Sequence, residues 1–411
     1  MRHGSGRLPF AAVPRLRLYL LGQLCSLTGT LAQQVAIAWW VFYLTHSSTL
    51  VGITVALAQL PILALAPFAG VLGDRVDRRR MLIGTQIAGA IQASVVAVLA
   101  ALGRLDVPAV LLLSLVAGLV SAFDTPARQA LVPRLVDRPQ QIRSAVAWNA
   151  AVLHIARLSG PALAAVLLSR FTIVSCCLAN VASYGVAIVV LQSLSGTAHE
   201  PIRALSIAAL RDGIRYAAGE RGVRRVLAVV AATSLVAIPY TVLLPAIARS
   251  WEGPQAPAYA RLMSSAGLGS LAAAITLART RDDRKLAAAI PIALLLGGVT
   301  LVLLGFTGAV AATPVLMATV AGIGFALTIV VSGGNVLLQQ HVPEQLRGRV
   351  SSLFVVVFNG AMPVGALVLG ALADRIGAAR AIVVAGTVAG ISAAIALLGA
   401  RFRVGDRRRA G

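Results

Sequence analysis

The stretch GVLGDRVDRRRML, residues 70–82, places a cluster of charges between two long apolar runs. The charged residues stand close to Gly70 and Gly73 and are Asp74, Arg75, Asp77, Arg78, Arg79 and Arg80. A charged turn of this kind is typical of a short loop between two membrane-spanning helices, because arginines oppose translocation across the bilayer. The two glycines permit close backbone approach at the end of the preceding helix. Asp74 is well placed to interact with the positive N-terminus of a neighbouring helix.

The composition indicates a membrane protein. Of 411 residues, 58% are hydrophobic and only 12% are charged, and the mean hydropathy is +0.86. A helix needs about 20 apolar residues to cross roughly 30 Å of hydrocarbon. The first apolar run is long and lacks a small-residue cleavage site, so we expect an uncleaved anchor. We expect an all-α membrane protein whose twelve transmembrane helices lie at 15–44, 50–72, 81–102, 108–127, 141–168, 172–193, 223–248, 257–277, 286–307, 311–335, 348–372 and 381–401.

The basic residues follow the loops. The chain has 36 Lys and Arg residues against 14 Asp and Glu residues, a formal net charge of +22. Most of the basic residues lie in the N-terminal segment, the C-terminal tail and alternate loops, a distribution that argues against nucleic-acid binding. Under the positive-inside rule, it places both termini in the cytoplasm and the protein in the bilayer of the inner or plasma membrane.

The second half of the chain repeats features of the first half. A shift of 205 residues maps DRRRML, which begins at Asp77, onto DDRKLA at Asp282–Ala287, and it maps Gly160 onto Gly365. Repeats of this kind are common in secondary transporters. We therefore expect two six-helix bundles, 1–194 and 223–411, joined by a cytoplasmic linker at 195–222.

These features resemble the major facilitator superfamily, in which the pattern G-x-x-x-D-R-x-D-R-R-R lies between helices 2 and 3. The stretches YLTHSS (43–48), FDTPARQALVP (123–133), RLSGPALA (157–164) and LRGRVSSL (346–353) are similar to its siderophore-exporter and macrolide-efflux-like branch. The resemblance implies two pseudo-symmetric bundles, a small-molecule substrate and alternating access. It also implies that Asp74 latches against the N-terminal end of helix 11, near 349–352, in the outward-facing state. The conformational-switch residues would be Gly70, Asp74, Arg75, Arg78, Arg79 and Arg80.

The ionisable residues bear on proton coupling. The predicted span 108–127 contains no arginine, and the fourteen acidic residues fall in loops or within about a turn of a span end, with Asp124 the nearest to an exception. Intramembrane carboxylates commonly form proton relays in transporters. Their absence from the middle of the predicted spans argues against proton antiport, and a coupling proton stays an open alternative.

Six polar residues in apolar surroundings are candidates for substrate binding: Thr30, Gln34, His154, Arg157, Tyr240 and Asn359. His154 and Arg157 are three residues apart and share one helix face. A guanidinium in lipid costs at least about 2.5 kcal/mol, so Arg157 should face a wet cavity or a partner. The alternative is a structural arginine that binds carbonyls near Gly160. For Thr30 and Gln34, at i and i+4, the alternative is hydrogen bonding between helices, and for His154 it is packing with a satisfied ring nitrogen.

The sequence contains few motifs for disulfide, metal, nucleotide or hydrolytic chemistry. The three cysteines lie in predicted spans and indicate neither a disulfide framework nor a zinc site, and no Walker-type or H-E-x-x-H motif occurs. We expect no enzyme activity, no metal and no cofactor. The favoured function is a monomeric secondary exporter of a medium-sized amphipathic or anionic small molecule, siderophore-like or another secondary metabolite. The alternatives are a multidrug or macrolide proton antiporter and, from another class, a non-transporting membrane sensor or scaffold.

Cysteine labelling in intact cells tests this topology. Cysteines placed at Gly196 and Gly405 should react with an impermeant reagent only after permeabilisation, because both positions lie in basic, cytoplasmic segments. A cysteine at Gly253, in a loop with few basic residues, should react without permeabilisation. Labelling of position 196 from outside would overturn the assignment.

Overall fold

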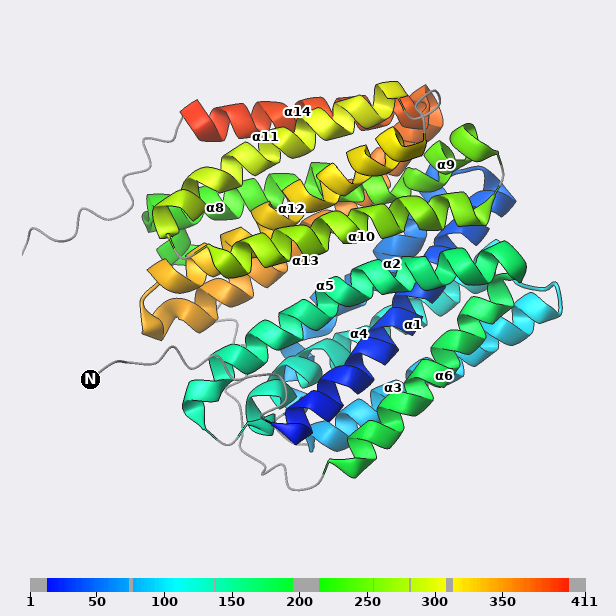
Figure 1. The fold of residues 1–411 in the computed structure, drawn as a ribbon, viewed down its shortest axis with the longest axis horizontal. Coiled ribbons are helices and arrows are strands. Elements are labelled where there is room, and N and C mark those ends of the chain that lie inside the picture. The colour runs from blue at the N-terminus through cyan, green and yellow to red at the C-terminus, as the bar shows by residue number, and fades with distance from the viewer. Residues whose placement is uncertain are drawn as a thin grey trace, which may run out of the picture.

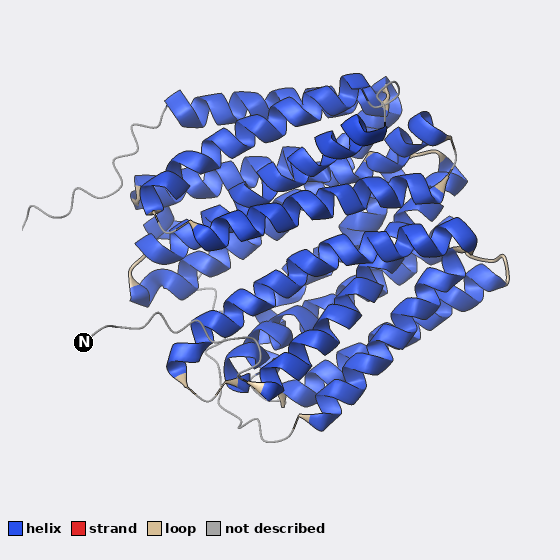
Figure 2. Cartoon of the chain, in the orientation of Figure 1, coloured by secondary structure: helices blue, strands red, loops and turns tan. Residues whose placement is uncertain are grey.

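The computed structural model describes residues 13–73, 77–136, 138–194, 214–253, 255–280, 282–307 and 313–398, and this part of the chain is helical, without strands (Figures 1 and 2). The first half contains α1 Pro14–Thr45, α2 Ser48–Gly73, α3 Arg78–Ala101, α4 Val107–Leu131, the short 3₁₀ helix η2 Val132–Leu135, α5 Pro139–Arg170 and α6 Ile173–Ser193. The second half contains α8 Arg221–Ala232, η3 Thr233–Ala237, η4 Ile238–Val242, α9 Leu244–Glu252, α10 Ala256–Arg279, α11 Asp283–Thr307, α12 Thr313–His341, α13 Glu344–Ile376 and α14 Ala378–Leu398.

The expected all-α membrane fold is confirmed. Among the described residues, eleven helical segments are long and apolar enough to cross a membrane. The other long helix, α1, carries more polar side chains, but its 32 residues exceed the roughly 20 that a crossing needs. Each of the twelve predicted spans overlaps one of these segments. Among the α-helices, a large difference in a boundary is at α12, which continues to His341 instead of ending at 335.

The helices form two groups that meet along two seams. In the amino bundle, α1 packs against α5 and α6, α3 against α4 and α6, and α2 against α4. In the carboxyl bundle, α11 packs against α12 and α14, and α10 against α12. The main contacts between the bundles are those of α2 with α13 and of α5 with α10, which lie alongside each other in Figure 1. The repeat makes the two seams equivalent, because the shift of 205 residues maps α2 onto α10 and α5 onto α13.

The positions that the sequence repeat pairs have matching local structure. Asp77 caps α3 by accepting hydrogen bonds from the backbone N–H groups two and three residues later, at 2.7 and 3.2 Å. Asp282 caps α11 through the same pair of positions, at 2.9 and 3.3 Å. A side-chain oxygen before the first turn satisfies N–H groups that the helix itself leaves unpaired. The two halves therefore match in how these helices are capped as well as in amino-acid sequence.

The seventh span is interrupted, although we expected one helix over 223–248. Between α8 and α9 the chain forms a π-helical turn, η3, and a 3₁₀ turn, η4. Pro239 and Pro245 lie in this region, and proline lacks the N–H that a regular helix requires. Gly365 of α13 faces the interruption, and a Cβ placed there would lie 1.9 Å from the carbonyl oxygen of Leu235. The missing side chain at 365 lets the widened turn approach α13.

The two ends of the molecule differ in how closely the bundles approach. We call the end where α1 begins and α14 ends the terminus side, and the opposite end, where α1 ends and α2 begins, the far side. On the far side, Trp39 of α1 stacks on Tyr259 of α10 with 6.3 Å between ring centroids, and His46 contacts Arg249 of α9. Towards the terminus side, α5 and α10 separate (Figure 1).

Glycine substitutions test the close approach at the interrupted helix. Gly365→Ala should lower the thermal unfolding temperature in detergent, because overpacking against backbone costs about 1–3 kcal/mol. Gly390→Ala in α14 is the matched control, since a Cβ there meets nothing within 4 Å and alanine favours the helix. Equal unfolding temperatures for the two variants would contradict the packing.

Candidate functional site

The charged stretch 70–82 lies at the terminus side, between α2 and α3. Gly70 is in the last turn of α2. Asp74 and Arg75 lie outside the described residues, so the latch expected for Asp74 stays a prediction.

The three consecutive arginines of this stretch have different surroundings. Arg78 is buried, and its Nη1 lies 3.5 Å from the carbonyl oxygen of Ala130 in α4. Arg79 donates to the carbonyls of Leu191 and Gln192 at the end of α6, both at 2.5 Å, while the side chain of Arg80 is exposed. A cation at a helix C-terminus satisfies unpaired carbonyls and offsets the helix dipole. The arginines therefore tie the start of α3 to the ends of α4 and α6.

A largely buried ion pair lies on α4. Asp124 and Arg128 form an ion pair one turn apart, and their side chains are 14% and 13% exposed. The expectation that the fourth span contains no arginine is wrong, because α4 continues past Pro126 to Leu131, which is buried in the bundle. Asp124 accordingly lies about two turns inside the helix. The spacing of an acid and an arginine at i and i+4 was the sequence signal for this pair.

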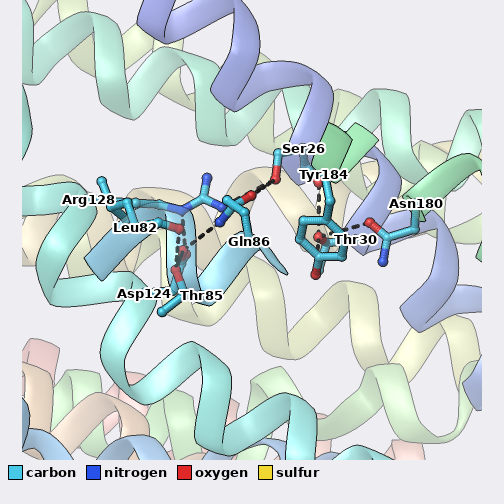
Figure 3. A network of polar contacts seen from close by, with 9 residues as sticks. All are labelled: Ser26, Thr30, Leu82, Thr85, Gln86, Asp124, Arg128, Asn180 and Tyr184. Carbon is cyan, nitrogen blue, oxygen red and sulfur yellow. Dashed lines mark hydrogen bonds and ion pairs between the residues drawn. The ribbon is translucent and has the colours of Figure 1, made fainter. Parts of the chain in front are cut away.

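The ion pair is part of a closed ring of hydrogen bonds among α1, α3 and α4 (Figure 3). Asp124 Oδ1 accepts from Thr85 Oγ1 at 2.8 Å and from Gln86 Nε2 at 2.7 Å. Gln86 Oε1 accepts from Ser26 Oγ at 2.9 Å, and Arg128 Nη2 donates to the same Ser26 oxygen at 3.3 Å. A buried carboxylate with a paired charge and two further donors is well satisfied. The ring therefore fixes the relative position of three helices.

A small cavity adjoins this ring. The polar residues that line it are Tyr19, Gln23, Gln86 and Arg128, and the other lining residues are Gly22, Leu82, Ala187, Val190 and Leu191. The Tyr19 hydroxyl and Gln23 Oε1 are buried and have no hydrogen-bond partner within the described part of the chain. Buried polar atoms are generally satisfied by protein groups or by ordered water. The lining is therefore suited to water beside the Arg128 guanidinium.

A second set of polar contacts joins α1 to α3 and α6. Asn180 Nδ2 donates to Gln33 Oε1 at 2.8 Å, and Gln33 Nε2 donates to Gln92 Oε1 at 3.2 Å. The Thr30 hydroxyl lies 3.3 Å from Asn180 Oδ1 and from the Tyr184 hydroxyl (Figure 3). Thr30 therefore has partners inside the amino bundle, as the interhelical alternative required.

His154 connects the two bundles. It is buried, and its Nδ1 lies 2.9 Å from Ser270 Oγ of α10. Ser270 in turn accepts a hydrogen bond from Thr328 Oγ1 of α12 at 2.9 Å. The ring nitrogen is thus satisfied across the α5 and α10 seam.

Arg157 and Gln34 have exposed side chains. Neither side chain forms a hydrogen bond or ion pair with another described residue. The backbone of Arg157 nevertheless lies in the seam, because a Cβ on Gly267 of α10 would be 2.4 Å from its carbonyl oxygen. A polar side chain without a partner beside a bundle junction is available to a ligand.

The last two candidates lie in the carboxyl bundle. Tyr240 is in η4 and only 3% exposed, and Asn359 on α13 is half-buried. Within the described residues, no side-chain hydrogen bond joins any two of the six candidates. No group of three or more His, Cys, Asp or Glu side chains there could hold a metal ion.

Comparison with known proteins places the chain among transporters. The family model described as "Transmembrane secretion effector" matches residues 9–409. The macrolide efflux protein A of Streptococcus pyogenes is 25% identical over 381 residues, which cover 91% of this chain and 93% of that protein. The staphyloferrin A transporter of Staphylococcus aureus is 23% identical and covers 86% and 88% respectively. The crystal structure of a bacterial homologue of the iron transporter ferroportin, in an inward-facing state, has a TM-score of 0.71 at 18% identity and covers 93% of this chain and 98% of that one.

Paired substitutions test the buried ion pair. Asp124→Asn should lower the free energy of unfolding by about 3–5 kcal/mol, because it leaves the Arg128 charge buried without a counter-charge. The double variant Asp124→Asn with Arg128→Met should recover much of the loss, as chemical unfolding in detergent would measure. The control is Glu252→Gln, since Glu252 pairs with Arg261 at a more exposed place, and the expected loss is below about 1 kcal/mol. Equal losses in the free energy of unfolding for Asp124→Asn and Glu252→Gln would contradict the claim that burial makes the Asp124–Arg128 pair more important for stability.

Proposed function

Because the chain belongs to the transmembrane secretion effector family of the major facilitator superfamily, we propose that it exports a medium-sized amphipathic or anionic small molecule, siderophore-like or another secondary metabolite, by alternating access. The observation that carries the proposal is the arrangement of two bundles that meet along two equivalent seams. Rocking of one repeat against the other about a central site is the way such transporters move their substrates. The relatives named for macrolide efflux and for staphyloferrin A support a small-molecule substrate.

The moving units of this proposal are residues 1–194 and 223–411, joined by a linker at 195–222. Each unit is extensively packed within itself, and contacts between the units are concentrated in the two seams. The protein works in the bilayer as a monomer, because each chain supplies both halves of the junction.

The terminus side faces the cytoplasm in this proposal. The starts of α1, α3 and α8 lie on that side, and each has arginines in its first turn. Positively charged segments are retained in the cytoplasm. The bundles contact one another on the far side and separate towards the terminus side, so the structure corresponds to an inward-facing state. The inward-facing state of the ferroportin homologue supports this interpretation.

Arg157 and Gln34 are the residues through which we expect the substrate to be recognised. Both side chains are exposed and lack partners among the described residues, whereas Thr30 and His154 are engaged within the protein. An arginine presents a planar fork of donors that matches carboxylate and phosphate groups. This chemistry favours a substrate with an anionic group.

A second candidate function is a multidrug or macrolide proton antiporter. The specific observation in its favour is Asp124, a largely buried carboxylate in the interior of α4 whose partners Gln86 and Arg128 line a small cavity. Buried carboxylates of membrane helices are common members of proton relays. Proton movement coupled stoichiometrically to export would favour the antiporter, and export without it would favour the first candidate.

Two substitutions at Arg157 test its role in recognition. Arg157→Gln should keep near-native thermal stability but lose affinity by about tenfold or more for anionic compounds, since hydrogen bonds to charged groups contribute roughly 1.5–3 kcal/mol. Arg157→Lys should lose less, because the charge remains while the fork of donors is lost. Binding is measured as thermal stabilisation by a panel of charged and neutral metabolites and antibiotics. Poor folding of Arg157→Gln, with no dependence on substrate charge, would assign Arg157 a structural role instead.

A further inference from the structure

The first turn of α2 is capped by a residue of the other bundle. Asp374, in the last turn of α13, accepts hydrogen bonds from the backbone N–H of Ser48 at 2.7 Å and of Thr49 at 3.1 Å. Its Oδ2 also accepts from the Ser47 hydroxyl at 2.6 Å. The Ser47 oxygen in turn accepts from the N–H of Leu50 at 3.2 Å. Asp374 and Ser47 together satisfy the first three N–H groups of α2.

This cap differs from the other aspartate caps of the protein. Asp77, Asp106 and Asp282 each cap the helix that directly follows them in the sequence. Asp374 follows α2 by about three hundred residues and belongs to the opposite side of a seam. An N-terminal cap contributes about 0.5–2 kcal/mol, and an acidic group near the positive end of a helix adds to it. Here that contribution depends on contact between the bundles.

The backbones of α2 and α13 are in close contact around the cap. A Cβ on Gly370 would lie 2.6 Å from the carbonyl oxygen of Ser48, and one on Gly52 would lie 2.5 Å from that of Ala366. The two helices therefore cannot separate on the far side without removing the carboxylate from the α2 N-terminus. Once they separate, the N–H groups of Ser48 and Thr49 lose their acceptors.

We propose that Asp374 is a positioning residue that holds the far side closed and is released each time the transporter opens outward. This inference rests on the proposed alternating-access function and assigns it a specific latch. The opposite end of the same antiparallel helix pair has the same type of residue in the sequence, because Asp74 directly follows the last residue of α2.

Distances between spin labels in the full-length protein test the latch without requiring a known substrate. In a variant without its native cysteines, labels at Leu102 and Phe306, both exposed, report on the far side. Labels at Ser193 and Leu398 report on the terminus side. Asp374→Asn should raise the ratio of far-side-open to far-side-closed molecules by about tenfold, because the amide has no charge and only one accepting oxygen, whereas both oxygens of Asp374 accept hydrogen bonds. The far-side distances should widen and the terminus-side distances should shorten together.

Matched variants separate a latch from general destabilisation. Asp106→Asn removes the charge from a far-side cap within one bundle and should leave both distance distributions unchanged. Asp374→Glu keeps the charge and should shift the ratio less than Asp374→Asn. Ser47→Ala removes one donor to Asp374 and should shift the ratio in the same direction by a smaller factor, which keeps the test available if Asp374→Asn does not fold.

Native-like distances in Asp374→Asn, or in Ser47→Ala if only that variant folds, would overturn the latch. So would an equal shift in Asp106→Asn. Failure of the proposed export function has a different signature, namely that no compound is exported or stabilises the protein while the spin-label result stands.

Discussion

The architecture depends on backbone contact at two helix seams. Lipid tails are as apolar as leucine side chains, so membrane helices associate through close packing at small residues and through polar contacts. Gly52 and Gly370 provide this approach between α2 and α13, and Gly267 provides it between α5 and α10. The two bundles are therefore held together along narrow lines, whereas each is packed broadly within itself. A junction of this kind can open at one end while the bundles keep their internal structure.

Polar side chains have two different roles in this structure. Those around Asp124 and Arg128 are bonded to one another and make the amino bundle rigid, because buried polar groups are costly unless they are satisfied. Those at Gln34 and Arg157 are exposed and have no partner among the described residues. His154 and Asp374 form a third group, whose hydrogen bonds cross the seams. Movement between the bundles must change the surroundings of this third group first.

The features that the sequence predicted correctly are those that depend on local patterns of residues. The helices, and the equivalence of Asp77 with Asp282, follow from apolar runs and from capping residues next to the helices that they cap. The predicted fourth span ended at 127, whereas α4 continues to Leu131, which is buried in the bundle, and therefore includes Arg128. The partners of Thr30 and Asp374 could not be predicted, because they lie on helices far away in the sequence and are set by packing.

The central claim is that export requires the α2 and α13 seam to open on the far side. A cross-link across the far side tests it most directly, using cysteines at His46 and Arg249, whose side chains are in contact between the two bundles. The measurement is export of a compound that thermally stabilises the protein, before and after reaction with a short, reducible bifunctional thiol reagent, in a variant without its native cysteines. We predict that cross-linking abolishes export and that a reductant restores it. Undiminished export by the fully cross-linked protein would contradict the claim.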